Sequence, residues 1–215
     1  MRKILTGLAI LALVYNGASA GLFGDDVDLA DLSQLSPEAL ETFKDKEFNV
    51  FLMKVKHSGA KVLENKAKND LKTSKLTLDA KQQHFKSAEA DLKEAKAAQD
   101  STRIDAAEKV LRNANIELAH AKLLIQWKEK EVDVQAASVE KAKLAVALAE
   151  AERDVARVSK LIEQNVPSAQ KYNLSDFKTK LDKKHKEYQK ALGTETKEIV
   201  EAKKLKAEYE KLSTQ

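Results

Sequence analysis

Residues 104–125, IDAAEKVLRNANIELAHAKLLI, set the fold class of this 215-residue chain. Their apolar side chains alternate spacings of three and four residues, which is the repeat of one face of a coiled coil. The members are Ile104, Ala107, Leu111, Ala114, Leu118, Ala121 and Ile125, and the same phase continues through Val132, Val139, Ala142, Val146 and Ala149. A second stripe joins it from Ala137 to Ile162. Because two adjacent stripes make a broad apolar face, this helix should contact more than one neighbour.

Breaks in the pattern on either side of this segment mark its ends. The polar run Gln99–Thr102 offers a helix start with Thr102 as N-cap. At the other end Pro167 stops the pattern, since the residue before a proline avoids helical angles. Ser168 can then cap a last helix. Apart from Pro167 and Gly193, residues 60–215 contain no proline or glycine, a composition typical of long packed helices.

The first helix has a clear start, with Ser36 as N-cap and Pro37 at the first helical position. Its expected apolar stripe is Phe43, Phe51 or Leu52, Val55, Val62 or Leu63, Ala67, Leu71, Leu78, Phe85, Ala88 and Leu92. We therefore predict an all-α domain over residues 36–215, with helices near 37–99, 102–164 and 169–213. The fold would be an elongated antiparallel helical hairpin or a three-helix coiled-coil bundle. If helix continues through residues 99–102, the first two helices merge into one longer rod.

The N-terminus is typical of a cleavable signal peptide over residues 1–20. Arg2 and Lys3 precede an apolar run from Ile4 to Tyr15, which is shorter than the ~20 residues that span a bilayer. Residues 16–20, NGASA, end in the small-x-small pattern that signal peptidase requires, and an uncleaved anchor is the alternative. Residues 21–35, with four aspartates, are expected to form a flexible acidic lead-in. The predicted location is the periplasm, with secretion outside the cell as an alternative.

The absence of cysteine excludes a lipoprotein signal and disulfide bonds. The formal net charge is +4, and loss of Arg2 and Lys3 would leave about +2, with Lys and Glu interspersed. A nucleic-acid surface would gather its cations on one face beside aromatic or glycine-rich elements, so we expect no nucleic-acid partner.

No arrangement of residues predicts catalysis or a cofactor. The chain has no cysteine nucleophile, no Gly-x-Ser-x-Gly turn and no phosphate-binding glycine loop. Glu117 and His120 have the Glu-x-x-His spacing of di-iron bundles, but such sites need a second copy and two more glutamates. We interpret this pair as a solvated helical pair, and Trp127 as core or rim packing. The prediction is a non-enzymatic protein without a metal or cofactor.

The turn before the last helix carries a resemblance to a known family. Arg157, Leu161 and Ser168, within the stretch LAEAERDVAR (148–157) and LIEQNV (161–166), resemble the Arg-Leu-Ser pattern at the hairpin tip of periplasmic adaptor (membrane fusion) proteins. The resemblance implies that these three residues contact the end of a TolC-type outer-membrane channel. It covers about forty residues, and the lipoyl and β-barrel domains of complete adaptors are absent from this sequence. The alternative interpretation makes Ser168 an N-cap, Leu161 a core residue and Arg157 a surface cation near a helix C-terminus.

Three functional hypotheses follow. The first is an exported structural or scaffolding rod of the cell envelope that binds protein partners and could form homo-oligomers. The second is an adaptor-like hairpin that docks on an outer-membrane channel. The third is a holding chaperone that resembles the periplasmic Skp family, although no strands are predicted that could build the small β body of that family.

Overall fold

The computed structural model describes residues 27–213, and these fold into helices joined by short turns, with no strand among them. The elements are α2 (Leu29–Leu32), α3 (Pro37–Glu41), α4 (Lys44–Ala97), α5 (Ser101–Glu163), the 3₁₀ helix η1 (Pro167–Lys171) and α6 (Leu174–Ser213). The predicted all-α, elongated fold is confirmed. The predicted signal peptide, residues 1–20, and residues 21–26 lie outside the described part of the chain.

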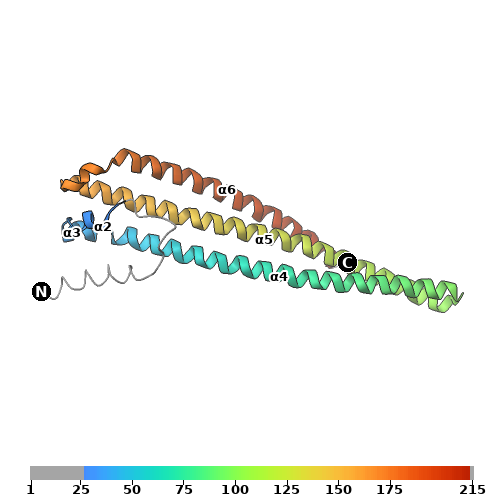
Figure 1. Ribbon diagram of the computed structural model, residues 1–215. Helices are drawn as coiled ribbons and strands as arrows, with labels where there is room; N and C mark the ends of the chain where they lie inside the picture. The colour runs from blue at the N-terminus through green and yellow to red at the C-terminus, as the bar shows by residue number, and fades with distance from the viewer. Residues whose placement is uncertain (1–26, 214–215) are drawn as a thin grey trace.

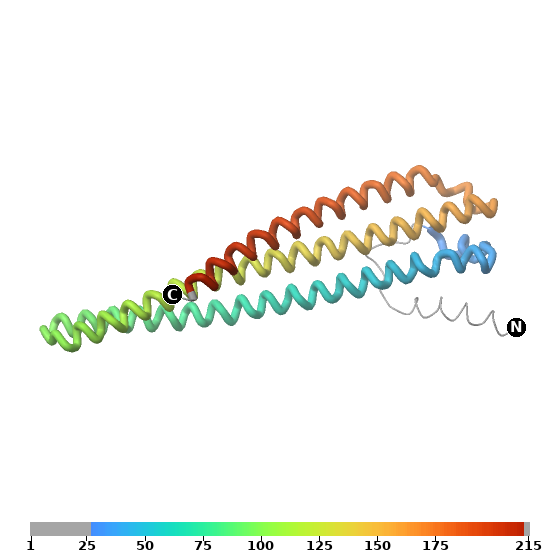
Figure 2. Tube along the Cα trace, turned by 180° about the vertical axis from the view of Figure 1, so that it is seen from behind, coloured from blue at the N-terminus to red at the C-terminus, as the bar shows by residue number. Residues whose placement is uncertain are grey.

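The three long helices form an open layer with α5 in the middle. Figures 1 and 2 show α4 and α6 on opposite sides of α5, and the helices pack extensively in the pairs α4–α5 and α5–α6 but not α4–α6. With 63 residues, α5 is about 95 Å long. The broad apolar face of α5 therefore does contact two neighbours, as its two stripes predict.

The layer narrows to two helices toward one end. α6 ends well past the middle of the rod but before its tip, near the point where Tyr209 stacks on His120 of α5 with ring centroids 4.3 Å apart. Beyond that contact α4 and α5 continue as a pair, which both views show as the tapered end of the molecule (Figures 1 and 2). We call residues 82–116 the arm. Its seam is built on buried alanines, Ala88, Ala95 and Ala114, which let the two helices approach closely.

The seam of α4 differs from the predicted stripe in its first half. The predicted stripe places Val55 in the core together with Phe51 or Leu52 and Val62 or Leu63, yet Phe51, Val55, Val62 and Leu63 are all more than half exposed, and only Leu52 is partly buried. The side of α4 that faces α5 carries Val50 and Ala60 instead, followed by Ala67 of the predicted stripe, and all three are buried. Small residues on this side allow close packing against the alanines of α5. From Leu71 to Leu92 the predicted stripe and the observed seam coincide.

The turn between α4 and α5 confirms the break at residues 99–102 and corrects its cap. Thr102 lies inside α5, and the N-cap is Asp100, whose carboxylate accepts a hydrogen bond from the Arg103 amide at 3.1 Å. Gln99 adopts a left-handed conformation with φ of 54°. Helices commonly end on such a residue, which is usually glycine because a side chain is disfavoured there.

Replacing Gln99 by glycine is therefore expected to stabilise the hairpin by about 0.5–1 kcal/mol, since it removes the strain of the left-handed residue. The urea midpoint, followed by circular dichroism, measures the change. Ala98→Gly is the matched control, because Ala98 is right-handed and glycine there should destabilise the protein. Equal effects of the two substitutions would contradict the expected gain.

The turn before α6 also contains a left-handed residue, like the turn between α4 and α5. Its helix cap differs from the one predicted. Asn165 is left-handed with φ of 51°, a conformation that asparagine tolerates well. Ser168 does not cap the last helix, because it lies within η1. Asn173 takes that role, and its side-chain oxygen accepts a hydrogen bond from the Ser175 amide at 3.0 Å. The polar turn of η1 thus separates the end of α5 from the start of α6.

Residues 27–35 also differ from the expected flexible lead-in, because they fold against the end of the rod. Val27, Leu32 and Leu35 are buried there, and Asp28 caps α2 by accepting a hydrogen bond from the Ala30 amide at 2.9 Å. Although this segment is acidic in composition, it also contains three apolar side chains, and these pack against α5 and η1. Ser36 is the N-cap of α3, as predicted, and accepts a hydrogen bond from the Ala39 amide at 3.2 Å.

None of the helices in residues 27–213 combines the length and the apolar composition needed to cross a bilayer.

Candidate functional site

The wide end of the rod holds the largest apolar core of the described residues, and we call it the base. It joins the N-terminal segment, the end of α5 and η1 in one cluster. Its buried members are Val27, Leu32, Leu35, Ala39, Phe43, Val158, Leu161, Val166 and Ala169. Gln164 ties the two parts together, because its amide accepts a hydrogen bond from the Ser36 backbone and donates one to the Ser36 hydroxyl, both at 3.0 Å.

Leu161, the second of the three residues in the predicted tip motif, lies at the centre of the base. Its exposed fraction is 0%. The segment from Val27 to Phe43 covers it, so Leu161 contributes to stability and is not presented to a partner. The structure thus agrees with the alternative interpretation of Leu161 as a core residue.

Arg157 belongs to a group of four charged residues, Glu47, Arg153, Asp154 and Arg157, which we call the charge cluster; the last three are buried and Glu47 is partly exposed. The Arg157 guanidinium donates a hydrogen bond to Glu47 of α4 and lies 3.6 Å from the Asp154 carboxylate. Arg153 lies 2.9 Å from Asp154 and 3.8 Å from Glu47. The four formal charges cancel. Arg157 is only 5% exposed, so it is neither the surface cation nor the exposed contact that the two sequence interpretations expected.

Ser168 lies at the rim of the base beside a second polar group. There Asp31 of α2 accepts a hydrogen bond from the Tyr172 hydroxyl and forms an ion pair with Lys171 at 2.6 Å. Lys171, Tyr172 and Ser168 together hold the pKa of Asp31 below its usual value. In turn burial and the neighbouring Asp31 raise the pKa of Tyr172. The rim group therefore fastens α2 to η1.

This rim group predicts acid sensitivity of the base. In the unfolded chain Asp31 titrates near the ordinary pKa of 3.8, and in the folded protein its pKa is lower. The ionised carboxylate therefore stabilises the fold fully above pH 3.8, and that contribution is lost as the pH falls through the lowered pKa. Asp31→Asn is expected to be less stable than the wild type at neutral pH, and the difference should close in acid.

Urea unfolding of both proteins at neutral pH and at several acidic pH values measures this difference. A difference between the two proteins that stays constant from neutral pH into strong acid would show that the carboxylate charge is not what fastens α2.

Arg157, Leu161 and Ser168 are thus brought to the same end of the molecule, but they do not form an exposed contact surface. The segment of residues 27–47 covers the first two. A channel could reach Arg157 and Leu161 only if that segment moved away.

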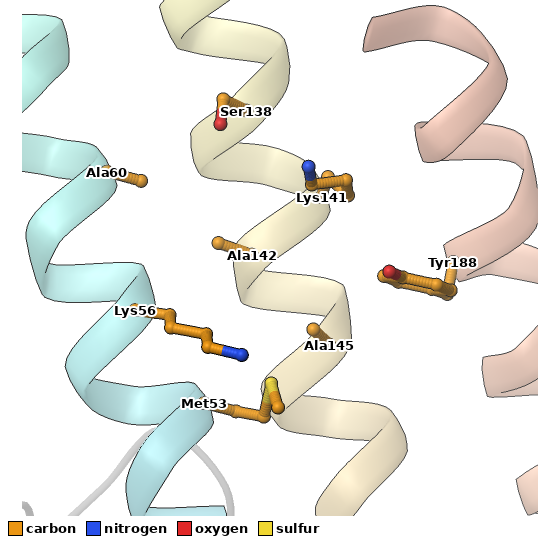
Figure 3. Close-up of a pocket in the computed structure, with 8 residues that line it drawn as sticks. All are labelled: Met53, Lys56, Ala60, Ser138, Lys141, Ala142, Ala145 and Tyr188. Carbon is orange, nitrogen blue, oxygen red and sulfur yellow. The ribbon is translucent and has the colours of Figure 1, made fainter. Parts of the chain in front are cut away.

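A shallow groove of about 290 Å³ lies over α5 between α4 and α6. Figure 3 shows Lys56 of α4 and Tyr188 of α6 extending across it, above the small side chains of Ala142 and Ala145 on α5. The groove exists because α4 and α6 flank α5 without closing over it. Its floor is small and apolar, and the polar side chains that line it are Lys56, Ser138, Lys141 and Tyr188.

The interpretation of Trp127 as core or rim packing agrees with the observed contacts, whereas Glu117 and His120 do not form the solvated pair that we predict from the sequence. Glu117 forms ion pairs with Lys81 at 2.9 Å and with His84 at 3.4 Å, and Lys81 contributes most to lowering its pKa. His120 turns instead to Tyr209, which also lies 5.4 Å from Trp127. Within residues 27–213 no group of three or more His, Asp or Glu side chains is placed to hold a metal ion.

Charged side chains hold α4 and α6 to α5 along the rod. Lys54 of α4 bridges the buried Glu150 at 3.0 Å, and Lys141 bridges the buried Glu195 of α6 at 2.6 Å. Lys130 contacts Glu198 and Glu201 of α6 at 2.9 and 3.1 Å, and Glu198 contributes most to raising its pKa. These pairs fix which face of each helix meets α5.

Sequence reasoning missed two surfaces that could carry function. One is the outer side of α4, where Phe48, Phe51, Val55 and Val62 are exposed; the apolar pattern was noticed there but assigned to the core. The other is the arm, where Val110 and Ile116 are exposed. Comparison of the chain with protein-family models, curated proteins and solved structures found no match.

Proposed function

We propose that the protein is an exported, non-enzymatic rod of the cell envelope that acts as a spacer and binds a protein partner through its arm. The observation that supports this most is the change from three helices to two along the rod (Figures 1 and 2). The base has an apolar core and a largely buried charge cluster, which suit it to anchor the structure. The arm projects beyond α6 on a narrow alanine seam, with its outer surface free for contacts.

The arm carries features of a binding surface as well as of a spacer. Val110 and Ile116 are 44% and 57% exposed on α5, beyond the end of the α6 contact. Further toward the base, the corresponding region of α5 is covered by α6. A partner helix that binds the arm could therefore continue the packing that α6 makes on the rest of α5.

Photo-crosslinking in intact cells tests this proposal. A photoreactive amino acid at Val110 or Ile116 is expected to capture one defined protein, whereas the same residue at Val200, an exposed position on α6, should not. Identification of the captured protein also reports the compartment. The same diffuse crosslinking from Val200 as from the arm positions would contradict a specific role of the arm.

The length of the arm offers a second test. Removing residues 85–91 of α4 together with residues 109–115 of α5 takes one heptad from each helix and preserves the phase of both seams. The arm becomes shorter by about 10 Å. A spacer should lose its crosslinked partner or its cellular role while keeping its helix content. Full function of the shortened protein would remove the spacer hypothesis.

The two other hypotheses receive less support. Docking on a TolC-type channel through Arg157, Leu161 and Ser168 needs those side chains at the surface, and the first two are buried in the base. The Skp-like chaperone hypothesis stays a prediction, which an assay of aggregation suppression with an unfolded outer-membrane protein would test.

A further inference from the structure

The outer side of α4 near the base carries an exposed apolar stripe. Phe48, Phe51, Val55 and Val62 are spaced by three, four and seven residues, so they share one side of the helix, and each is more than half exposed. The rings of Phe48 and Phe51 lie 6.4 Å apart. Five of the eleven large apolar side chains that are exposed within residues 27–213 lie between Phe48 and Leu63. We call this surface the outer stripe.

The outer stripe points away from the rest of the protein. The buried residues Val50, Ala60 and Ala67 mark the side of α4 that meets α5, and helical geometry places the outer stripe on the opposite side. α4 is an edge helix of the layer, with α5 on one side of it (Figures 1 and 2). None of the packing described above uses these side chains, so their exposure costs solubility without stabilising the fold.

Positive charge lies beside the outer stripe. Between Phe48 and Asn69 the sequence has five lysines, at positions 54, 56, 61, 66 and 68, and one acidic residue, Glu64. Glu64 is paired with Lys68 at 2.7 Å. On a helical projection Lys61 borders the stripe and Lys66 follows at its end, whereas Lys54 pairs with Glu150 of α5 and Lys56 extends into the groove over α5. An occupant of this surface should therefore be apolar where it meets the stripe and negatively charged beside it.

A second copy of the chain fits this requirement poorly. If two copies paired through the outer stripe, each would bring the same lysines to the contact, and like charges would face each other. An acidic partner helix would have the right charge. However, the apolar pattern lasts only about two heptads before Asn65 and Asn69, and coiled coils need three to four. Binding to a flat surface does not require an apolar pattern of that length.

We propose that the outer stripe docks the rod onto the surface of a membrane that contains anionic lipids. Phe48, Phe51, Val55 and Val62 would enter the boundary between headgroups and acyl chains, and Lys61 and Lys66 would contact lipid phosphates. Basic helices with one apolar, aromatic side bind membranes in this way and lie in the plane of the interface. This inference stands beside the proposed spacer role and does not depend on it.

Vesicle binding tests the proposal. Every described contact lies within residues 27–213, so a chain that begins at Gly21 keeps all of them and lacks the apolar run of the predicted signal peptide. Because the chain has no cysteine, Val55→Cys supplies a single position for an environment-sensitive fluorophore. Its emission should shift to the blue with vesicles of phosphatidylglycerol and phosphatidylcholine in equal parts. Phosphatidylcholine alone, or high salt, should reduce the shift.

Unlabelled variants separate the apolar and the charged contributions in a vesicle co-sedimentation assay. Phe48→Asn with Phe51→Asn is expected to weaken binding about tenfold or more. Lys61→Gln and Lys66→Gln together should weaken it about tenfold and reduce the salt dependence. Leu192→Asn with Val200→Asn makes the same kind of change at exposed positions of α6 and should leave binding unchanged.

A gain of binding is expected from Gly59→Leu. Gly59 lies between Val55 and Val62 near the stripe, and no atom outside its own helix lies within 4 Å of the position of an added Cβ. Leucine there extends the apolar surface, so binding should tighten severalfold, and the helix should become more stable because glycine is unfavourable in a helix interior.

Three results would overturn the proposal. The first is no binding of the wild type to the anionic vesicles. The second is equal binding of the wild type and the Phe48→Asn/Phe51→Asn variant. The third is blue-shifted emission of the label without vesicles, or rapid disulfide-linked dimer formation by unlabelled Val55→Cys, since either result means that protein already covers the stripe. Capture of an acidic protein at position 55 together with failure to bind vesicles would assign the surface to that protein instead.

Discussion

Replacing Leu161 by alanine is expected to lower the free energy of unfolding by about 3–4 kcal/mol, which is within the range for buried leucines. Leu161 is completely buried in the base, among Val27, Phe43 and Val158. The substitution leaves a cavity at the point where the N-terminal segment, the end of α5 and η1 meet. Because residues 27–43 share this apolar core with α5 and η1, the cavity should also loosen that segment.

The neighbouring residue provides the control for this prediction. Ile162 is 41% exposed and follows Leu161 in the same helix, so Ile162→Ala should cost less than about 1 kcal/mol. Urea unfolding followed by circular dichroism gives both values, and limited proteolysis reports opening of residues 27–43. Similar losses from the two substitutions would mean that the base does not hold the described fold together.

This pair of variants also distinguishes the two interpretations of the tip motif. A contact residue for a channel can be replaced with little loss of stability, because it is exposed in the free protein. A core residue cannot. Loss of a partner in a Leu161 variant would therefore say nothing about contact unless the fold of that variant were shown to be intact.

The fold class could be predicted from the sequence because the apolar pattern of one long helix clearly indicates which side of it packs. From Ile104 to Ile125 a single apolar stripe repeats with the heptad, and no competing stripe exists, so position and burial agree. The second stripe from Ala137 onward correctly indicated another neighbour. The pattern does not predict that α4 and α6 lie on opposite sides of α5 in an open layer. This arrangement depends on the angle between the two stripes.

The prediction failed in the first half of α4 because two stripes compete there. Phe51, Val55 and Val62 are more apolar than Met53, Ala60 and Glu64, so a rule based on hydrophobicity selects the wrong side. The observed side pairs small residues with the alanines of α5, and the Lys54–Glu150 ion pair supports that choice. Complementarity with a second helix decided the orientation, and it is not a property of the α4 sequence alone.

The base was missed for a similar reason. Residues 25–31 contain four aspartates, and such a composition favours a flexible segment. Asp31 is nevertheless buried, because Lys171 and Tyr172 meet it from a turn about 140 residues away in sequence. Local composition cannot report such partners. The burial of the predicted site residues Arg157 and Leu161 was missed for the same reason, because the segment of residues 27–47 that covers them is distant in sequence.

Removing Asp154 is expected to be nearly as destabilising as removing Leu161. Asp154 is 3% exposed and lies between two buried arginines, Arg153 and Arg157, at 2.9 and 3.6 Å. With alanine at this position Arg153 and Arg157 would lose the buried carboxylate that lies between them. Removal of one partner from a buried ionic group costs about 3–5 kcal/mol, because the charge that remains is desolvated and not compensated. Since Glu47 still compensates in part, we expect about 3 kcal/mol.

Two further variants show whether the loss comes from charge. Glu152→Ala removes a carboxylate two residues earlier that pairs with Lys46 near the surface, and it should cost less than about 1 kcal/mol. Asp154→Leu combined with Arg157→Met removes one charge of each sign and fills the space with apolar atoms, so it should recover most of the stability lost in Asp154→Ala. Urea unfolding measures all three variants.

If the double variant stayed as unstable as Asp154→Ala, the geometry of the ion pairs rather than their charge balance would hold α4 to α5 at the base. If Asp154→Ala itself were as stable as Glu152→Ala, the charge cluster would contribute nothing beyond an exposed ion pair. The expected order of stability is Glu152→Ala, then the double variant, then Asp154→Ala. That order follows from the burial of Asp154 between two arginines, in contrast to the partly exposed position of Glu152 on the same helix.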